Sequence, residues 1–178
     1  MNLYLRLFYL LLWEIPRNKV RQSLLATSHF TFRVLPLDID INAHLTNSRY
    51  LALMDLARTK MLSDAGIFKA VMKKRWLPVL SSTEVTFLKD IKPWQRCTIE
   101  SKVVCWDEKY FYIEQRFVSG DKIHAIANIK GLFVHRRNKI SSKNFMALAD
   151  NEQGIVSPDM PEHIIHWNEL LKAKKEAG

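Results

Sequence analysis

Two carboxylates, an amide and an imidazole stand at alternate positions of one short stretch: Asp38, Asp40, Asn42 and His44. In an extended backbone, alternate side chains lie on one side of the chain. The hydrophobic Ile39 and Ile41 would then face a core on the other side. Such groups can perform acid–base or nucleophilic chemistry. The stretch therefore predicts a polar site backed by a core.

A long helix is expected to follow this cluster. Thr46 or Asn47 can serve as its N-cap, and Gly66 supplies a C-terminal stop. Between them, apolar residues recur at helical spacing: Tyr50, Leu53, Met54, Ala57, Met61 and Ala65. The unpaired N–H groups of the first turn would then lie beside the cluster and could polarise a carbonyl. Asp and Asn before a helix also act as caps and turn formers, so a structural role is the alternative for each of them.

The rest of the chain has the patterns of an antiparallel sheet. Strands are expected over residues 29–34, 83–88, 97–106, 110–118 and 123–135, and a short amphipathic helix over 162–174. One strand, then a long helix, then a meander is an α+β order. One sheet edge would remain exposed, and pairing with a second copy would protect it.

Composition limits the class of protein. The 178 residues are 48% hydrophobic and 25% charged, which fits one globular domain. The net charge of +9 suits polyanionic partners, including an anionic membrane face or a phosphorylated small molecule. The basic runs, Lys69 to Arg75 and Arg136 to Lys143, are too short to favour nucleic acid. Cys97 and Cys105 share one expected strand about 26 Å apart, so they cannot form a disulfide. This favours a reducing, cytoplasmic compartment and gives no support to a metal site.

The amino terminus divides from the rest by its hydrophobicity. Residues Leu3 to Trp13 are apolar except for Arg6, but they are too few to span a bilayer. The segment is expected either to lie in a membrane interface or to pack on the domain or a second subunit. We therefore divide the chain into an apolar segment at 1–22, a main domain at 23–150 and a carboxy-terminal extension at 151–178.

Several stretches resemble the hotdog-fold acyl-CoA thioesterases. Asp38-Ile39-Asp40 followed by Tyr50 and Met54-Asp55 resembles the 4-hydroxybenzoyl-CoA thioesterase pattern, and Asp38 through His44 is similar to the Asp-x-Asp-x-Asn-x-His run of plant acyl-carrier-protein thioesterases. The chain is most similar to the thioesterase superfamily member six group. The stretches that carry this likeness are Phe32 to Asp40, His44 with Asn47, Arg49 to Leu51, Asp55 with Ala57-Arg58, and Trp106-Asp107 with Phe111-Tyr112 and Arg116 to Ser119.

The resemblance implies a hotdog fold, an acyl-CoA substrate, a homodimer or higher homo-oligomer and no cofactor. It places the catalytic role on Asp40, as general base or nucleophile, with His44 and Asn42 as helpers. The substrate-binding candidates are Asn47, Tyr50, Asp38 and Glu84. Asp38 alternatively only closes the turn, and Glu84 faces either a partner's pocket or solvent.

Two other functions compete with hydrolysis. Hotdog hydratases carry an Asp-x-Asn-x-x-His spacing after a glycine, whereas here His44 comes one residue earlier and Leu37 precedes Asp38. The other competitor is a membrane-associated acyl-CoA binding protein without turnover, which the apolar amino terminus supports. Release of free thiol separates hydrolysis from both.

Overall fold

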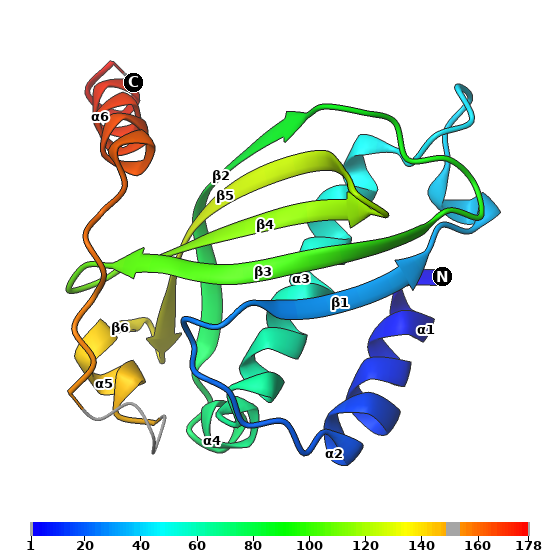
Figure 1. The fold of residues 1–178 in the computed structure, drawn as a ribbon. Helices are drawn as coiled ribbons and strands as arrows, with labels where there is room; N and C mark the ends of the chain where they lie inside the picture. Colours follow the sequence, from blue (N-terminus) through cyan, green and yellow to red (C-terminus); the bar gives the residue numbers. More distant parts are fainter. Residues whose placement is uncertain (1, 149–153, 178) are drawn as a thin grey trace.

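A curled antiparallel sheet wraps around one long helix in the structure, a computed structural model that describes residues 2–148 and 154–177 (Figure 1). The sheet order is β1-β3-β4-β5-β2, and β6 pairs with the end of β5. The strands are β1 Ser28–Arg33, β2 Leu77–Phe87, β3 Arg96–Trp106, β4 Phe111–Ser119, β5 Lys122–His135 and β6 Asn138–Ile140. The predicted α+β class and the antiparallel meander are confirmed.

The helices surround this sheet in chain order. They are α1 Asn2–Tyr9, the π-helical η1 Leu10–Glu14, α2 Ile15–Arg17, the 3-10 helix η2 Pro36–Asp38, α3 Asn47–Asp64, α4 Phe68–Lys73, α5 Ser142–Met146 and α6 Glu162–Glu176. The 18-residue α3 is the predicted central helix, and Thr46 is its N-cap residue, although the Thr46 side chain makes no capping hydrogen bond. Sequence analysis missed α4, α5 and β6, which are all short.

The concave face of the sheet holds the main core. Alternate residues of the strands point inward, and Phe32 of β1, Ile99 of β3 and Phe117 of β4 pack there with Leu53 and Met54 of α3. The inward positions follow the period of two that the sequence shows, because neighbouring side chains of a strand point to opposite faces. Burial of this apolar surface is the main force that holds α3 inside the sheet.

The opposite, convex face of the sheet is partly covered by α6. Ile164 and Trp167 of this helix are buried against Cys105 of β3 and Tyr112 of β4. Tyr112 hydroxyl and Asn168 also hydrogen-bond. The predicted carboxy-terminal helix is thus confirmed. The domain boundary predicted after residue 150 lies outside the described residues.

The amino-terminal segment packs on the domain with one face and exposes the other. Leu10 and Ile15 belong to the main core, and Leu3, Leu7 and Leu11 pack against it. The exposed face is also apolar: it carries Tyr4, Leu5, Phe8, Tyr9, Leu12 and Trp13. In residues 2–148 and 154–177, no helix is both long enough and apolar enough to cross a bilayer.

The two cysteines are as expected. Cys97 and Cys105 are both buried on β3, and neither forms a disulfide. Burial raises the pKa of Cys97 to about 12 and that of Cys105 to about 11. Both thiols are therefore protonated, unreactive core groups at neutral pH.

Candidate active site

Residues 39–45 form a tight turn directly before α3. Ile39 and Leu45 form a β-bridge, and the Asp40 amide donates to the His44 carbonyl over 3.0 Å. Ala43 at the tip has a φ of 58°, in the left-handed region. The Asp40 carboxylate accepts from the Asn42 amide at 2.9 Å, which is the Asx-turn hydrogen bond by which aspartate commonly starts a turn.

This turn corrects the extended backbone expected from the alternating pattern. The reversal sends Asp38 inward and Ile41 outward, so the four polar groups do not share one side of the chain. Ile41 was expected in the core, yet its side chain is 101% exposed. Only Ile39 packs against the core as predicted. The physical reason is local: side chain to backbone hydrogen bonding at Asp40 competes with strand geometry.

The structure brings Asp40 and His44 together. Asp40 Oδ2 lies 3.5 Å from His44 Nδ1, and both side chains are a little over a quarter exposed. A carboxylate beside an imidazole at a half-open position can take a proton from water or approach a carbonyl group. Asn42 is exposed, and its backbone amide, not its side chain, contacts Asp40.

Asp38 has a different environment, because it is buried at the base of the turn. Its Oδ2 accepts from Arg6 of α1 at 2.6 Å and from the Leu35 amide at 3.0 Å, and Oδ1 lies 3.8 Å from Arg49. Its side chain is 3% exposed. These contacts join α1, the turn and α3, which is the position of a group that closes the turn.

The remaining predicted site residues lie apart from one another. Asn47 is exposed in the first turn of α3. Tyr50 is buried, with its ring 4.9 Å from Phe87 and 4.7 Å from Phe117, and burial raises its pKa to about 12. Glu84 is exposed on β2, opposite Asn128 of β5.

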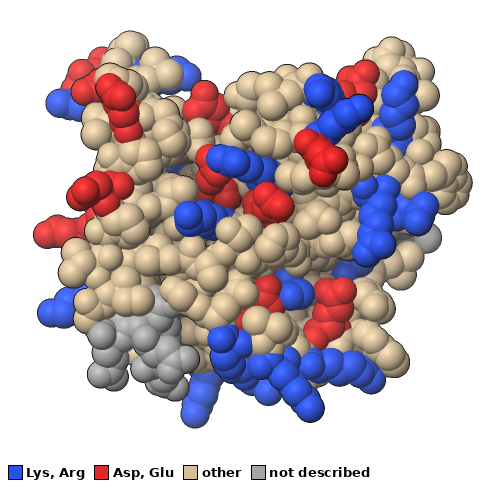
Figure 2. Space-filling view, viewed as in Figure 1, with Lys and Arg blue, Asp and Glu red and all other residues tan. Residues whose placement is uncertain are grey.

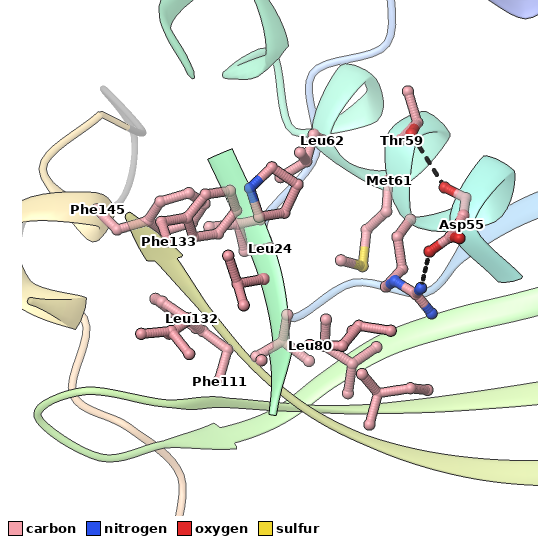
Figure 3. Close-up of a pocket in the computed structure, with 17 residues that line it drawn as sticks. Leu24, Asp55, Thr59, Met61, Leu62, Leu80, Phe111, Leu132, Phe133 and Phe145 are labelled. Carbon is pink, nitrogen blue, oxygen red and sulfur yellow. Dashed lines mark hydrogen bonds and ion pairs between the residues drawn. The ribbon is translucent and has the colours of Figure 1, made fainter. Parts of the chain in front are cut away.

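A cavity of about 240 Å³ lies between the second half of α3 and the strands (Figure 3). Its wall is mostly aliphatic and aromatic. The lining residues are Leu24, Asp55, Arg58, Thr59, Met61, Leu62, Pro78, Val79, Leu80, Val103, Phe111, Ile113, Ile129, Gly131, Leu132, Phe133 and Phe145. None of the seven site residues predicted from the sequence lines it. Its shape and apolar wall suit a hydrophobic ligand.

Polar groups of α3 stand at one side of this cavity. Arg58 donates to Asp55 and to Gln115 Oε1, and Thr59 donates to the Asp55 carbonyl (Figure 3). Gln115 is fully buried and donates in turn to Ser101 at 2.8 Å. Burial lowers the pKa of Arg58, and the charge of Asp55 opposes this shift. The sequence signal for this pair was present, because Asp55 and Arg58 are three residues apart on one helix face.

In the described part of the chain, no three His, Cys, Asp or Glu side chains are arranged to hold a metal ion. The chemistry available at Asp40 is therefore that of the carboxylate, the imidazole and backbone N–H groups.

Comparison with known proteins gives a consistent family. Residues 34–168 match the sequence model of the thioesterase-like superfamily. The protein THEM6 of Xenopus laevis is 30% identical over 151 residues, which cover 83% of this chain and 70% of that protein.

Solved structures show the same fold. The gentisyl-coenzyme A thioesterase BH1999 is 18% identical with a TM-score of 0.60, over 69% of this chain and 99% of that one. The Staphylococcus aureus protein SAV2348, solved in complex with CoA, is 14% identical with a TM-score of 0.63, over 83% and 95% of the two chains. The helix wrapped by a curled sheet is thus the hotdog fold that the sequence predicted.

Proposed function

This chain belongs to the thioesterase-like superfamily, and from that premise we propose that it hydrolyses an acyl-CoA to the free acid and CoA, with Asp40 as the catalytic carboxylate. Its enzyme class is thioester hydrolase. The single observation that carries the role of Asp40 is its position: a partly open carboxylate, 3.5 Å from an imidazole, stands directly before the N-terminus of α3.

The chemistry follows from these groups. Asp40 Oδ2 accepts a proton from water while the water oxygen attacks the thioester carbonyl, or Oδ2 attacks that carbon itself. The first-turn N–H groups of α3, near Asn47, stabilise the negative charge that develops on the carbonyl oxygen. The C–S bond then breaks, and the CoA thiolate takes a proton. His44 orients Asp40 or shares its proton.

The apolar cavity is proposed as the place for the acyl group. Its wall offers aliphatic and aromatic contacts, and its polar groups are concentrated at Asp55, Arg58 and Thr59 of α3. A fatty or aromatic acyl group has the matching chemistry. The CoA complex of the related fold supports a CoA thioester as the substrate.

A second copy would join the cavity to Asp40. Within one chain they lie at different parts of α3, because Asp40 precedes its first turn while Asp55 begins the cavity wall about 12 Å along the helix. The terminal strand β2 links the two regions: its Phe87 end contacts Tyr50, and its Pro78 to Leu80 end lines the cavity.

We propose that the β2 edges of two copies pair in antiparallel fashion around a twofold axis. This pairing sets the Phe87 end of one β2 against the Leu77 end of the other, so the turn of one copy approaches the cavity of its partner. The edge suits this use, because β2 ends the sheet order and exposes Leu77, Val79, Leu80 and Phe87. Glu84 on the same strand would then lie at the interface.

The proposed function is tested by thiol release from acyl-CoA substrates of different chain length, including aromatic ones. Asp40→Asn is expected to lower kcat by about 10² to 10⁴-fold with an unchanged melting temperature. Asp121→Asn, at the exposed β4–β5 turn, makes the same chemical change away from the site and should keep full activity. Full activity in Asp40→Asn removes the role of Asp40. Tight acyl-CoA binding without thiol release by the wild type supports the binding-protein alternative instead.

The same preparation separates the two roles of Asp40. In a single turnover in ¹⁸O-labelled water, a general base places the label directly in the released acid. A nucleophile places it in the carboxylate of Asp40 when water attacks the Asp40 carbonyl of the anhydride. Mass spectrometry of the peptide that contains Asp40 reads out the difference.

Peripheral membrane contact through α1 and η1 is a further part of the proposal. Their outward face exposes aromatic and aliphatic side chains, among them Phe8 and Trp13. Lys and Arg side chains gather along the lower edge in Figure 2, where Figure 1 places α2 and α4. Apolar side chains beside a basic edge suit an anionic bilayer surface.

Vesicle flotation tests this contact. The wild type should float with vesicles that contain phosphatidylserine, and Phe8→Asp with Trp13→Asp should abolish flotation. The control, Ile165→Asp with Leu170→Asp, changes two exposed apolar residues of α6. Equal flotation of the two double variants would contradict docking through α1 and η1.

A further inference from the structure

Four lysines from four parts of the chain meet around one tyrosine beside α6. They are Lys109 of the β3–β4 turn, Lys130 of β5, Lys139 of β6 and Lys175 of α6, and the tyrosine is Tyr110. The ammonium nitrogens of Lys109 and Lys130 lie 4.9 Å and 4.6 Å from the centre of the Tyr110 ring. We call these four lysines with Tyr110 the lysine cluster.

The cations of this cluster lie close enough to repel one another. Lys109 hydrogen-bonds with Lys139, so two ammonium groups are in direct contact. The charge of Lys175 acts on both Tyr110 and Lys130. In an unliganded protein, such an arrangement is unfavourable unless one group loses its proton or an anion neutralises the charge.

Nearby carboxylates do not neutralise the cluster. Asp107 is close, but its Oδ1 accepts from the amides of Lys109 and Tyr110, both at 2.7 Å, and its Oδ2 accepts from Tyr112 at 3.0 Å. Within residues 2–148 and 154–177, none of the four lysines forms an ion pair with a carboxylate. The excess of positive charge is therefore a property of this surface.

The titrating groups respond to this excess. The hydrogen bond with Lys109 and the charge of Lys109 lower the pKa of Lys139. Burial acts to raise the pKa of Tyr110, but the hydrogen bond and charge of Lys109, with smaller effects of Ser81 and Lys175, outweigh it and lower that pKa. Burial lowers the pKa of Lys130, against the charge of Asp107.

We propose that the lysine cluster, together with the hydroxyl of Ser81, binds a phosphomonoester dianion. The terminal oxygens of such a group accept several charge-assisted hydrogen bonds at once, and its two charges match a group of ammonium donors. A carboxylate supplies one charge and two oxygens. One of the donors is already positioned, because Lys130 Nζ donates to Asn168 of α6 at 2.5 Å.

The phosphomonoester can belong to a nucleotide or to a phosphoinositide headgroup, and both offer the same chemistry. The site does not depend on the proposed function, since it contains none of the residues assigned to hydrolysis. It also differs from the basic residues 73–75 and 136–137, which lie on other segments.

Binding of two probes to the whole protein tests the proposal. One probe is adenosine 3′,5′-bisphosphate, measured by calorimetry at physiological salt. The other is vesicles with phosphatidylinositol 4-phosphate, compared with phosphatidylserine vesicles of equal charge. The double variant Lys139→Gln with Lys175→Gln changes two exposed lysines of the cluster, and Lys122→Gln with Lys174→Gln removes the same charge from exposed positions outside it.

We expect at least one probe to bind the wild type, and the cluster variant to weaken that binding roughly tenfold, against less than twofold for the control. Preference for the nucleotide or for the phosphoinositide identifies the source of the phosphate, and either supports the proposal. No binding of either probe overturns it. Equal weakening in the two double variants also overturns it, because general charge would then explain binding.

A spectroscopic readout adds a check that activity cannot supply. The phenolate absorbance of Tyr110, identified by its loss in Tyr110→Phe, should appear below the ordinary pH of tyrosine ionisation. The bound dianion should shift it to higher pH, because the anion offsets the charge of the lysines. An unchanged titration at saturating probe would place the anion elsewhere.

Discussion

Arg6 is expected to connect the amino-terminal helix to the candidate site through one buried ion pair. Its guanidinium donates to Asp38 at 2.6 Å and to the Arg33 carbonyl at 2.8 Å, and it lies over the Phe32 ring at 5.6 Å. The Arg6 side chain is 15% exposed and that of Asp38 is 3% exposed. Replacing Arg6 with Met keeps much of the apolar stem but leaves the carboxylate without its main cation.

The magnitude follows from these contacts. Removing one partner of a buried ion pair costs about 3–5 kcal/mol, because the other charge stays buried. Here Arg49, 3.8 Å from the other Asp38 oxygen, and the Leu35 amide keep part of the stabilisation. We therefore expect Arg6→Met to lower the free energy of unfolding by about 2–3 kcal/mol. The loss should change little with salt, because a buried pair is poorly screened.

Urea unfolding of Arg6→Met, Asp38→Asn and the double variant measures this coupling. We expect an interaction energy of about 1.5 kcal/mol or more between the two positions. Arg17→Met is the matched control: Arg17 is exposed and stacks on Trp13 at 3.5 Å, a contact with an expected contribution of about 0.5–1 kcal/mol. A loss in Arg6→Met no larger than that of the control would refute the reasoning.

Three other perturbations have definite expected results. Because burial raises the pKa of Cys97 and Tyr50 to about 12 and that of Cys105 to about 11, their stabilisation is complete below about pH 9 and is lost as pH rises toward 11 to 12; urea titrations at increasing pH should show the decline, and a flat profile would contradict it. Gly66→Ala should cost about 1–2 kcal/mol, since Gly66 has a φ of +76° and an added Cβ would lie 2.5 Å from the Arg21 side chain, whereas Gly120→Ala has a positive φ but open space and should cost less. Leu80→Trp, at the half-exposed side of the cavity, should lower kcat/KM for long acyl-CoAs more than for acetyl-CoA; an equal effect on both would remove the cavity as the acyl site.

The central helix and the strands could be predicted because their signals are periodic and local. The apolar stripe from Tyr50 to Ala65 and the stop at Gly66 depend only on α3 itself. The inward residues of β1, β3 and β4 follow from alternation in the same way. The missed elements α4, α5 and β6 have at most six residues each, so they give too short a pattern to read.

The site was less predictable, because its geometry depends on distant contacts. Asp38 is buried by Arg6, which lies 32 residues earlier in the sequence. The left-handed Ala43 at the tip of the turn carries no glycine or asparagine signal. The cavity is built from residues as far apart as Leu24 and Phe145, and only the closed sheet brings them together.

Two exposed features that the single chain does not explain have one explanation in a pair of copies. Ile41 is entirely exposed at the turn beside Asp40, and β2 exposes apolar residues along an unpaired edge. Each is unfavourable in water. Antiparallel pairing of two β2 strands would cover the edge and place the turn of one copy near the apolar cavity of the other, where Ile41 gains a partner. The same geometry that protects these surfaces would bring Asp40 to the acyl group, so dissociation into single chains, each of 20.9 kDa, should remove activity although both Asp40 and the cavity remain intact.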